Sequence, residues 1–127
     1  EELAAAARRA ALGSYSPFSH FRVGAVVVAD DGRTFASANV ENAAYPEGIC
    51  AETSAIAAMV AAGGTRIVAI AAVGGRQALE ACTPCGGCRQ RIREFSDQNT
   101  RIVLLDDQGQ PRRYTMDELL PASFRLT

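Results

Sequence analysis

Two consecutive segments near the middle of the chain are apolar on nearly every face, and they restrict the possible folds most strongly. Cys50 to Ala62 consists largely of Ala, Ile, Met and Val and is followed by Gly63-Gly64. This pattern predicts a helix without a polar stripe, buried on all sides. Ile67 to Val73 is a continuous apolar run of strand length, typical of a strand covered on both faces. Such a strand indicates a sheet with helices on both sides.

The remaining patterns predict a helix over Glu2 to Leu12 and an antiparallel hairpin with strands Arg22 to Ala29 and Thr34 to Ala38. Asn39 to Ile49 has no regular apolar period and is predicted to be an irregular loop. The later elements are predicted to be a helix over Cys85 to Phe95, strands over Arg101 to Leu105 and Pro111 to Tyr114, and a short capped helix from Thr115 to Leu120. Together they predict an α/β protein, a three-layer α/β/α sandwich with a mixed five-stranded sheet, formed by residues 1–127 as one domain.

Charge and cysteine usage narrow the class of function. Thirteen basic and fourteen acidic side chains give a formal net charge of -1, and the two signs are interspersed, which argues against binding of polymeric nucleic acid. No apolar run is long enough to cross a bilayer, and no signal segment is visible, so no membrane partner and a cytoplasmic location are expected. Four cysteines in a chain of this kind favour metal or redox chemistry over disulfides.

The cysteines lie in a spacing that favours a metal. Cys85 and Cys88 are three residues apart at a predicted helix start, so both thiols project from one face. Alone, this spacing also fits a redox disulfide or a structural zinc site. Cys50 begins the other helix, and three thiolates leave one tetrahedral zinc position open, as in catalytic sites. The fourth cysteine, Cys82, is expected to be a spare thiol.

A carboxylate accompanies the proposed metal ligands. Zinc lowers the pKa of bound water from about 15.7 to about 7, which provides a nucleophile for attack on C4 of an aminopyrimidine. Glu52, two residues beyond Cys50, is the candidate that carries protons to the ring nitrogen and to the departing ammonia. Zinc deaminases combine such a glutamate, which is not a metal ligand, with a P-C-x-x-C element. The corresponding segments here are Cys50-Ala51-Glu52 and Pro84-Cys85-Gly86-Gly87-Cys88.

Over nearly its whole length, the sequence resembles the small, homotetrameric cytidine deaminases. The most specific stretch is Asn39-Val40-Glu41-Asn42-Ala43-Ala44-Tyr45-Pro46, followed by the two cysteine motifs and Arg89-Gln90. The resemblance implies one zinc ion per subunit and a homotetramer whose active sites are shared between subunits. It also implies hydrolysis of cytidine and 2′-deoxycytidine to uridine and 2′-deoxyuridine, with release of ammonia, in pyrimidine salvage.

The same resemblance implies roles for individual residues. Asn39 and Glu41 would bind the ribose hydroxyls, and Phe21 would line the nucleoside pocket. The backbone carbonyl of Thr83 would accept a hydrogen bond from the amino group that is lost. The other residues that would contact substrate or complete a neighbouring subunit's site are Ala43, Tyr45, Ala51 and Phe124. From the residues alone, without the resemblance, Asn39 and Glu41 are better explained as loop-stabilising side chains.

One position departs from the family pattern. Thr53 follows Glu52, where many members carry an arginine that offsets the charge of the zinc-bound thiolates. We expect the two helix N-termini, each equivalent to roughly +0.5 charge, to compensate in part, with help from Arg89 or Arg91.

Three competing functions follow from the same residues. The first is a deaminase of another aminopyrimidine nucleoside, of the blasticidin S type. The second is a catalytically silent zinc module that binds nucleosides or a protein, and the third is a redox protein in which Cys85 and Cys88 cycle through a disulfide. Editing of bases in DNA or RNA is disfavoured, because neither a basic channel nor an aromatic platform is recognisable.

Overall fold

The structure is a computed structural model that describes residues 2–80 and 82–126. Its elements are α1 (Glu2–Ala11), β1 (Arg22–Ala29), β2 (Thr34–Ala38), the 3₁₀-helix η1 (Tyr45–Glu47), α2 (Ala51–Ala61), β3 (Ile67–Gly75), β4 (Leu79–Glu80), α3 (Gly86–Glu94), β5 (Arg101–Leu105), β6 (Pro111–Tyr114) and α4 (Met116–Leu119). None of the described helices is long and apolar enough to cross a membrane.

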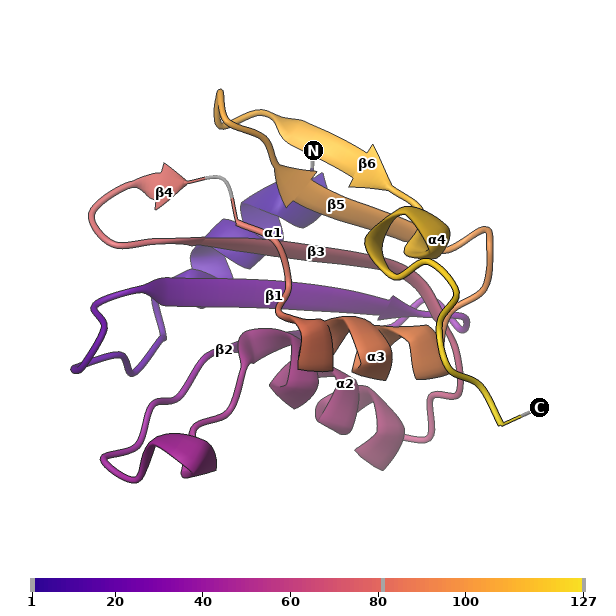
Figure 1. The fold of residues 1–127 in the computed structure, drawn as a ribbon, viewed down its shortest axis with the longest axis horizontal. Coiled ribbons are helices and arrows are strands. Elements are labelled where there is room, and N and C mark those ends of the chain that lie inside the picture. The colour runs from indigo at the N-terminus through magenta and orange to yellow at the C-terminus, as the bar shows by residue number, and fades with distance from the viewer. Residues whose placement is uncertain (1, 81, 127) are drawn as a thin grey trace.

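The strands form one mixed sheet in the order β2-β1-β3-β5-β6. Strand β1 pairs antiparallel with both β2 and β3, and β5 pairs antiparallel with β6. The β3–β5 pair is parallel. A parallel pair needs a long crossover, and the segment that contains α3 supplies it (Figure 1). The predicted mixed five-stranded sheet is therefore confirmed. The short strand β4, which pairs with the end of β3, was not predicted.

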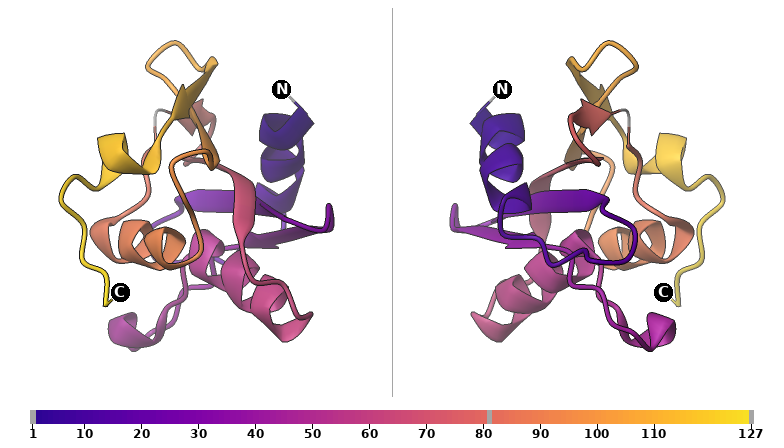
Figure 2. Two further views of the ribbon diagram at one scale, coloured as in Figure 1. Left: turned by 90° about the vertical axis from the view of Figure 1, so that its right-hand side faces the viewer. Right: turned by 90° about the vertical axis from the view of Figure 1, so that its left-hand side faces the viewer.

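Helices cover both faces of the sheet, as predicted. Figure 2 shows α1 on one side and α2, α3 and α4 on the other. Alternate residues of β1 supply the two cores, because successive side chains in a strand point to opposite faces. Val27 packs in the core beneath α2 and α3, whereas Val26 packs in the core beneath α1.

The helix α2 differs from its prediction in one respect. Its inner face, with Ala55, Ile56 and Met59, is buried against the sheet. On its outer face, Ala57 and Val60 are exposed, and Val60 shows 47% of its surface. The prediction that this helix is buried on all sides is wrong for the single chain, because the sheet covers one face only. An apolar outer face remains uncovered.

The helix α1 lies directly on the backbone of β1. A side-chain Cβ at Gly24 would lie 2.1 Å from the carbonyl oxygen of Ala7 and 2.4 Å from the amide nitrogen of Ala11. Both alanines are buried, and their small side chains allow this close approach. Only glycine leaves room for the helix at this position of the strand.

Candidate active site

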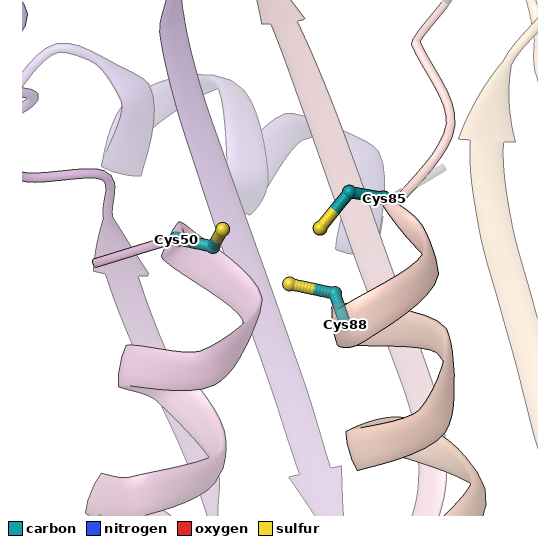
Figure 3. A group of neighbouring side chains, drawn as sticks. All are labelled: Cys50, Cys85 and Cys88. Atoms are coloured by element: carbon teal, nitrogen blue, oxygen red, sulfur yellow. The ribbon is translucent and has the colours of Figure 1, made fainter. Parts of the chain in front are cut away.

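Three thiols converge between the N-termini of two helices. Cys50 is the N-cap residue of α2, Cys85 is the N-cap residue of α3, and Cys88 lies in the first turn of α3. Their sulfur atoms lie within 4.8 Å of one another and point toward a common centre (Figure 3). Tetrahedral zinc with Zn–S bonds of about 2.3 Å places its sulfur ligands about 3.8 Å apart. The donor set and its spacing therefore fit a zinc ion.

The surroundings of the three thiols act on them differently. Burial raises the pKa of Cys50 and of Cys88, which disfavours their thiolate forms. The pKa of Cys85 is lowered, chiefly by the backbone N–H of Cys88 beside it. Because zinc binds thiolates, occupancy of the site requires proton release from Cys50 and Cys88. The N-termini of α2 and α3 add positive potential at the three thiols, which favours their thiolate forms.

Glu52 is buried beside the thiols. It lies in the first turn of α2 with 4% of its surface exposed, and its Oε1 atom lies 3.8 Å from the Sγ atom of Cys88. Burial raises the pKa of its carboxyl group. A carboxyl group whose pKa is raised toward neutrality can both accept and donate a proton. The arrangement therefore places a proton carrier next to the candidate metal.

Thr53 contacts the thiol cluster through its hydroxyl, whereas Arg89 bonds to the backbone. The Oγ1 atom of Thr53 is 3.5 Å from the Sγ atom of Cys88, so a neutral hydroxyl contacts the sulfur. Arg89 donates from Nε to the carbonyl oxygen of Pro84 at 2.8 Å and from Nη1 to that of Leu119 at 2.7 Å. Its hydrogen bonds thus go to backbone carbonyls. Any help from Arg89 in offsetting the thiolate charge acts through space.

A pocket of about 380 Å³ is lined by Cys50, Cys85 and Glu52, among other residues. Its volume falls within the range of small-molecule sites, about 300–1,000 Å³. Six of the eight residues that were predicted to contact substrate line it: Phe21, Asn39, Glu41, Tyr45, Ala51 and Thr83. Segments that are distant in the sequence therefore meet at one cavity.

Two predicted substrate residues lie elsewhere in the single chain. Neither Ala43 nor Phe124 lines the pocket, and the Phe124 side chain is 67% exposed. The backbone oxygen of Phe124 accepts a hydrogen bond from Nε2 of Gln90 at 3.3 Å. Tyr45 lines the pocket but is 76% exposed, with an edge-on contact to Phe18. The structure thus leaves the side chains of Tyr45 and Phe124 largely exposed to solvent.

Glu41 is tied to the loop before β1. Its carboxylate accepts hydrogen bonds from the backbone N–H groups of Phe18, at 2.9 Å, and Ser19, at 3.2 Å, and from the Ser19 hydroxyl. These donors, the hydroxyl foremost, lower the pKa of Glu41, so the side chain is ionised at neutral pH. A carboxylate offers about four acceptor positions, and the loop uses three of them.

Asn39 is fixed to the same loop. Its Oδ1 atom accepts from the backbone N–H of Val23 at 2.9 Å and from the hydroxyl of Ser14, and its Nδ2 atom donates to the carbonyl oxygen of Phe21 at 3.0 Å. Asn39 and Glu41 therefore stabilise the loop, as the residues alone suggested. Both also line the pocket, so the two interpretations are compatible.

Two residues near the pocket were not assigned a role from the sequence. Arg76 donates from Nε to the carbonyl oxygen of Ser19 at 3.3 Å, and its guanidinium carbon lies 5.8 Å from the centre of the Phe21 ring. Cys82 lines the pocket, and burial raises its pKa to about 11. Its sulfur is not part of the three-thiol cluster. No local pattern reveals Arg76, because its partners are more than fifty residues away in the sequence.

We expect metal content to distinguish the clustered thiols from the remaining one. Cys88→Ser should reduce bound zinc from one equivalent to less than about one tenth, because a hydroxyl is not deprotonated at neutral pH and the site loses one of three ligands. Cys82→Ser is the matched control and should retain full zinc. Metal analysis of the purified variants after dialysis is the measurement. Loss of zinc from Cys82→Ser alone would contradict this assignment of ligands.

The comparisons with known proteins agree with this geometry. Residues 1–104 match the family model described as the cytidine and deoxycytidylate deaminase zinc-binding region. A cytidine deaminase from Mycobacterium tuberculosis is 40% identical over 120 residues, which cover 94% of this chain and 85% of the relative. The crystal structure of a cytidine deaminase from Burkholderia pseudomallei superposes with a TM-score of 0.87 at 39% identity, covering 97% of each chain. The M. tuberculosis structure superposes with a TM-score of 0.82 at 39% identity, covering 98% of this chain and 96% of that one.

Proposed function

The chain belongs to the family of cytidine and deoxycytidylate deaminases, and we propose from this premise that it hydrolyses cytidine and 2′-deoxycytidine to uridine and 2′-deoxyuridine with release of ammonia. The main support is the position of Glu52, which lies buried between three clustered thiols and a pocket of nucleoside size. Residues 1–127 would act as one catalytic domain, because both halves of the site come from one sheet and the helices on it.

The thiol cluster and Glu52 have complementary tasks in this proposal. Cys50, Cys85 and Cys88 would hold the zinc ion, which would supply a nucleophile at neutral pH by lowering the pKa of a bound water to about 7. Glu52 takes one proton from the attacking water and donates it to the ring nitrogen N3 as the oxygen bonds to C4. It then carries the remaining proton of the new C4 hydroxyl to the amino group, so that the C4–N bond breaks, ammonia leaves and the C4 carbonyl forms. One water is consumed and one ammonia is released for each nucleoside. The carbonyl oxygen of Thr83 accepts a hydrogen bond from the amino group before it leaves.

The pocket wall orients the nucleoside. Asn39 and Glu41 bind the ribose hydroxyls, and Phe21 packs against the nucleoside. Two observations support these roles: all three residues line the pocket, and the same loop holds them. Glu41 retains about one free acceptor position after its loop contacts. Side chains fixed before substrate arrives bind it with a smaller loss of conformational entropy.

The substrate assignment is tested with a panel of aminated nucleosides. We expect the zinc-loaded protein to release ammonia from cytidine and 2′-deoxycytidine and to release little or none from adenosine or blasticidin S. Blasticidin S as the preferred substrate would favour the deaminase class named after it. Absence of turnover with every nucleoside, despite one bound zinc, would favour a silent zinc module.

We further infer that the active protein is a homotetramer with shared active sites. Apolar surface that is uncovered in the single chain supports this inference. Val60 on the outer face of α2 is 47% exposed, and Val40 and Ile49 beside the pocket are 47% and 48% exposed. Exposed apolar patches commonly mark subunit contacts. Ala43 and Phe124 then complete the pocket of a neighbouring subunit. Thiolate ligands of this kind also favour a reducing, cytoplasmic location.

Oligomer size gives a direct test of this inference. Sedimentation velocity should give a mass near four times 13.4 kDa. Val60→Asp should shift the protein toward smaller species, because a charge in an apolar contact loses its hydration. Arg33→Asp, which changes an exposed side chain of the β1–β2 turn, serves as the control. A wild-type monomer with full activity would refute shared active sites.

A further inference from the structure

The start of β1 and the end of β3 lie at the same end of the sheet (Figure 1). Two hollows that share lining residues lie there. The first, of about 360 Å³, is lined by four arginines: Arg8, Arg9, Arg22 and Arg76. The second, of about 380 Å³, shares Arg22 and Arg76 with the first. These four side chains are called the arginine trough below. Among the described residues, neither hollow shares a lining residue with the active-site pocket.

The positive charge of the arginine trough is not balanced by its surroundings. Within the described ranges, no acidic side chain lines either hollow. The two ion pairs of the described residues, Arg33–Asp31 and Arg66–Asp97, involve none of the lining arginines. Glu80 is the acid near Arg76 in the structure, and its carboxylate accepts the Arg76 backbone N–H at 3.3 Å. Four arginine residues therefore line one hollow in a protein whose net charge is only -1.

The dipole of α1 explains the position of only two of the four arginines. Arg8 and Arg9 lie in the last turn of α1, where positive charge interacts favourably with the helix dipole. Arg22 and Arg76 lie at strand ends instead, and Arg22 pairs in register with Gly75, the residue before Arg76. Like charges held close together raise the energy of the fold. A bound anion would remove that cost.

The chemistry of the lining identifies the class of anion. Arginine presents a planar fork of donors that matches phosphate oxygens in pairs. Tyr15 and Ser16 also line the second hollow, and their hydroxyl groups offer further donors for phosphate. Leu12 and Ala78 give the first hollow an apolar wall. We propose that the arginine trough binds the phosphate chain of a nucleoside di- or triphosphate, with the apolar wall against the nucleoside part.

Arg76 connects the arginine trough to the active-site pocket. The same guanidinium group donates to the carbonyl oxygen of Ser19 and lies over the Phe21 ring. Ser19 in turn holds the carboxylate of Glu41. An anion that binds Arg76 changes the contacts of Arg76 with Ser19 and Phe21, and through Ser19 those of Glu41. Binding of triphosphate and binding of nucleoside therefore affect each other's affinity. This coupling rests on the proposed deaminase function, whereas binding of the anion does not.

Binding is tested on the full, zinc-loaded chain by isothermal titration with CTP, ATP and inorganic triphosphate at two salt concentrations. We expect saturable binding of one ligand per subunit. In the double variant Arg8→Ala/Arg22→Ala, affinity should fall at least tenfold. The matched control is Arg101→Ala/Arg113→Ala, which removes two arginines from a different hollow near β5 and β6, and its affinity should stay within about twofold. If the double variant does not fold, Arg22→Gln replaces it.

Several outcomes would overturn the proposal. They are absence of binding, equal weakening in the test and control variants, and tighter binding of a single-stranded oligonucleotide than of any triphosphate. For the coupling, inorganic triphosphate should shift the KM for cytidine at least twofold in the wild type, with zinc content checked afterwards. It carries no base that could compete for the nucleoside pocket. An unchanged KM overturns the coupling, and deamination without triphosphate, measured on the same preparations, tests the proposed function separately.

Discussion

Replacing Glu52 with glutamine should lower kcat for cytidine by about a thousandfold while the protein keeps one zinc per subunit, because general acid–base groups typically contribute about 10²–10⁴-fold. Glutamine has nearly the same shape as glutamate but does not accept and release a proton at neutral pH. The side chain is 4% exposed, and its hydrogen-bond partner in the structure is the Cys88 thiol. The substitution therefore removes the proposed proton carrier and leaves the three clustered thiols in place.

The measurements for this variant are ammonia release under saturating cytidine, metal analysis and thermal denaturation. Glu47→Gln, an exposed acid of η1 that does not line the pocket, is the control and should retain wild-type kcat. A Glu52→Gln enzyme that keeps more than about a tenth of wild-type kcat with full zinc content would mean that another group moves the protons. Loss of zinc in this variant would instead make Glu52 part of the metal site.

Gly24→Ala should lower the free energy of unfolding by about 3 kcal/mol or more, since overpacking a tight contact costs about 1–3 kcal/mol and occasionally more. The added methyl group would lie 2.1 Å from the Ala7 carbonyl oxygen and 2.4 Å from the Ala11 nitrogen. These are backbone atoms, so no rotation of a side chain relieves the clash. The helix α1 has to move away from β1, which opens the core formed by Ala4, Ala7 and Val26.

Thermal and urea denaturation measure this effect. The matched control is Gly13→Ala, just beyond the end of α1, where the nearest neighbour of the new methyl group is the Ala10 carbonyl oxygen at an ordinary 3.6 Å. That variant should be as stable as the wild type or slightly more stable, because alanine restricts the unfolded chain. Equal stabilities of the two variants would show that α1 does not press on β1 as described.

The parts of the fold that were predicted correctly depend on local patterns. The strands Arg22–Ala29 and Thr34–Ala38 have their predicted bounds, because the turn between them contains a glycine at φ +90 that the hairpin requires. The capping box at Thr115 is present as predicted. In each case a few neighbouring residues determine the conformation, so the sequence pattern is sufficient.

The parts that were missed depend on contacts between distant segments. Strand β4 has only two residues, which is too short for any apolar alternation. The outer face of α2 is exposed although its composition is apolar, because composition does not specify what covers a helix. The position of Arg76 over Phe21 follows from the pairing of β1 with β3. For the candidate site, motif spacing indicated Cys50, Cys85 and Cys88, whereas the supporting loop contacts of Glu41 required coordinates.

The distribution of the three sulfurs over two helices also has a consequence for folding. Cys50 and Cys85 are 35 positions apart in the chain, so an ion that joins them closes a loop of that length. In the chain-entropy model, a permanent cross-link of this span restricts the denatured ensemble by about 4 kcal/mol. A zinc ion bound by these cysteines would thus also act as a reversible cross-link between α2 and α3.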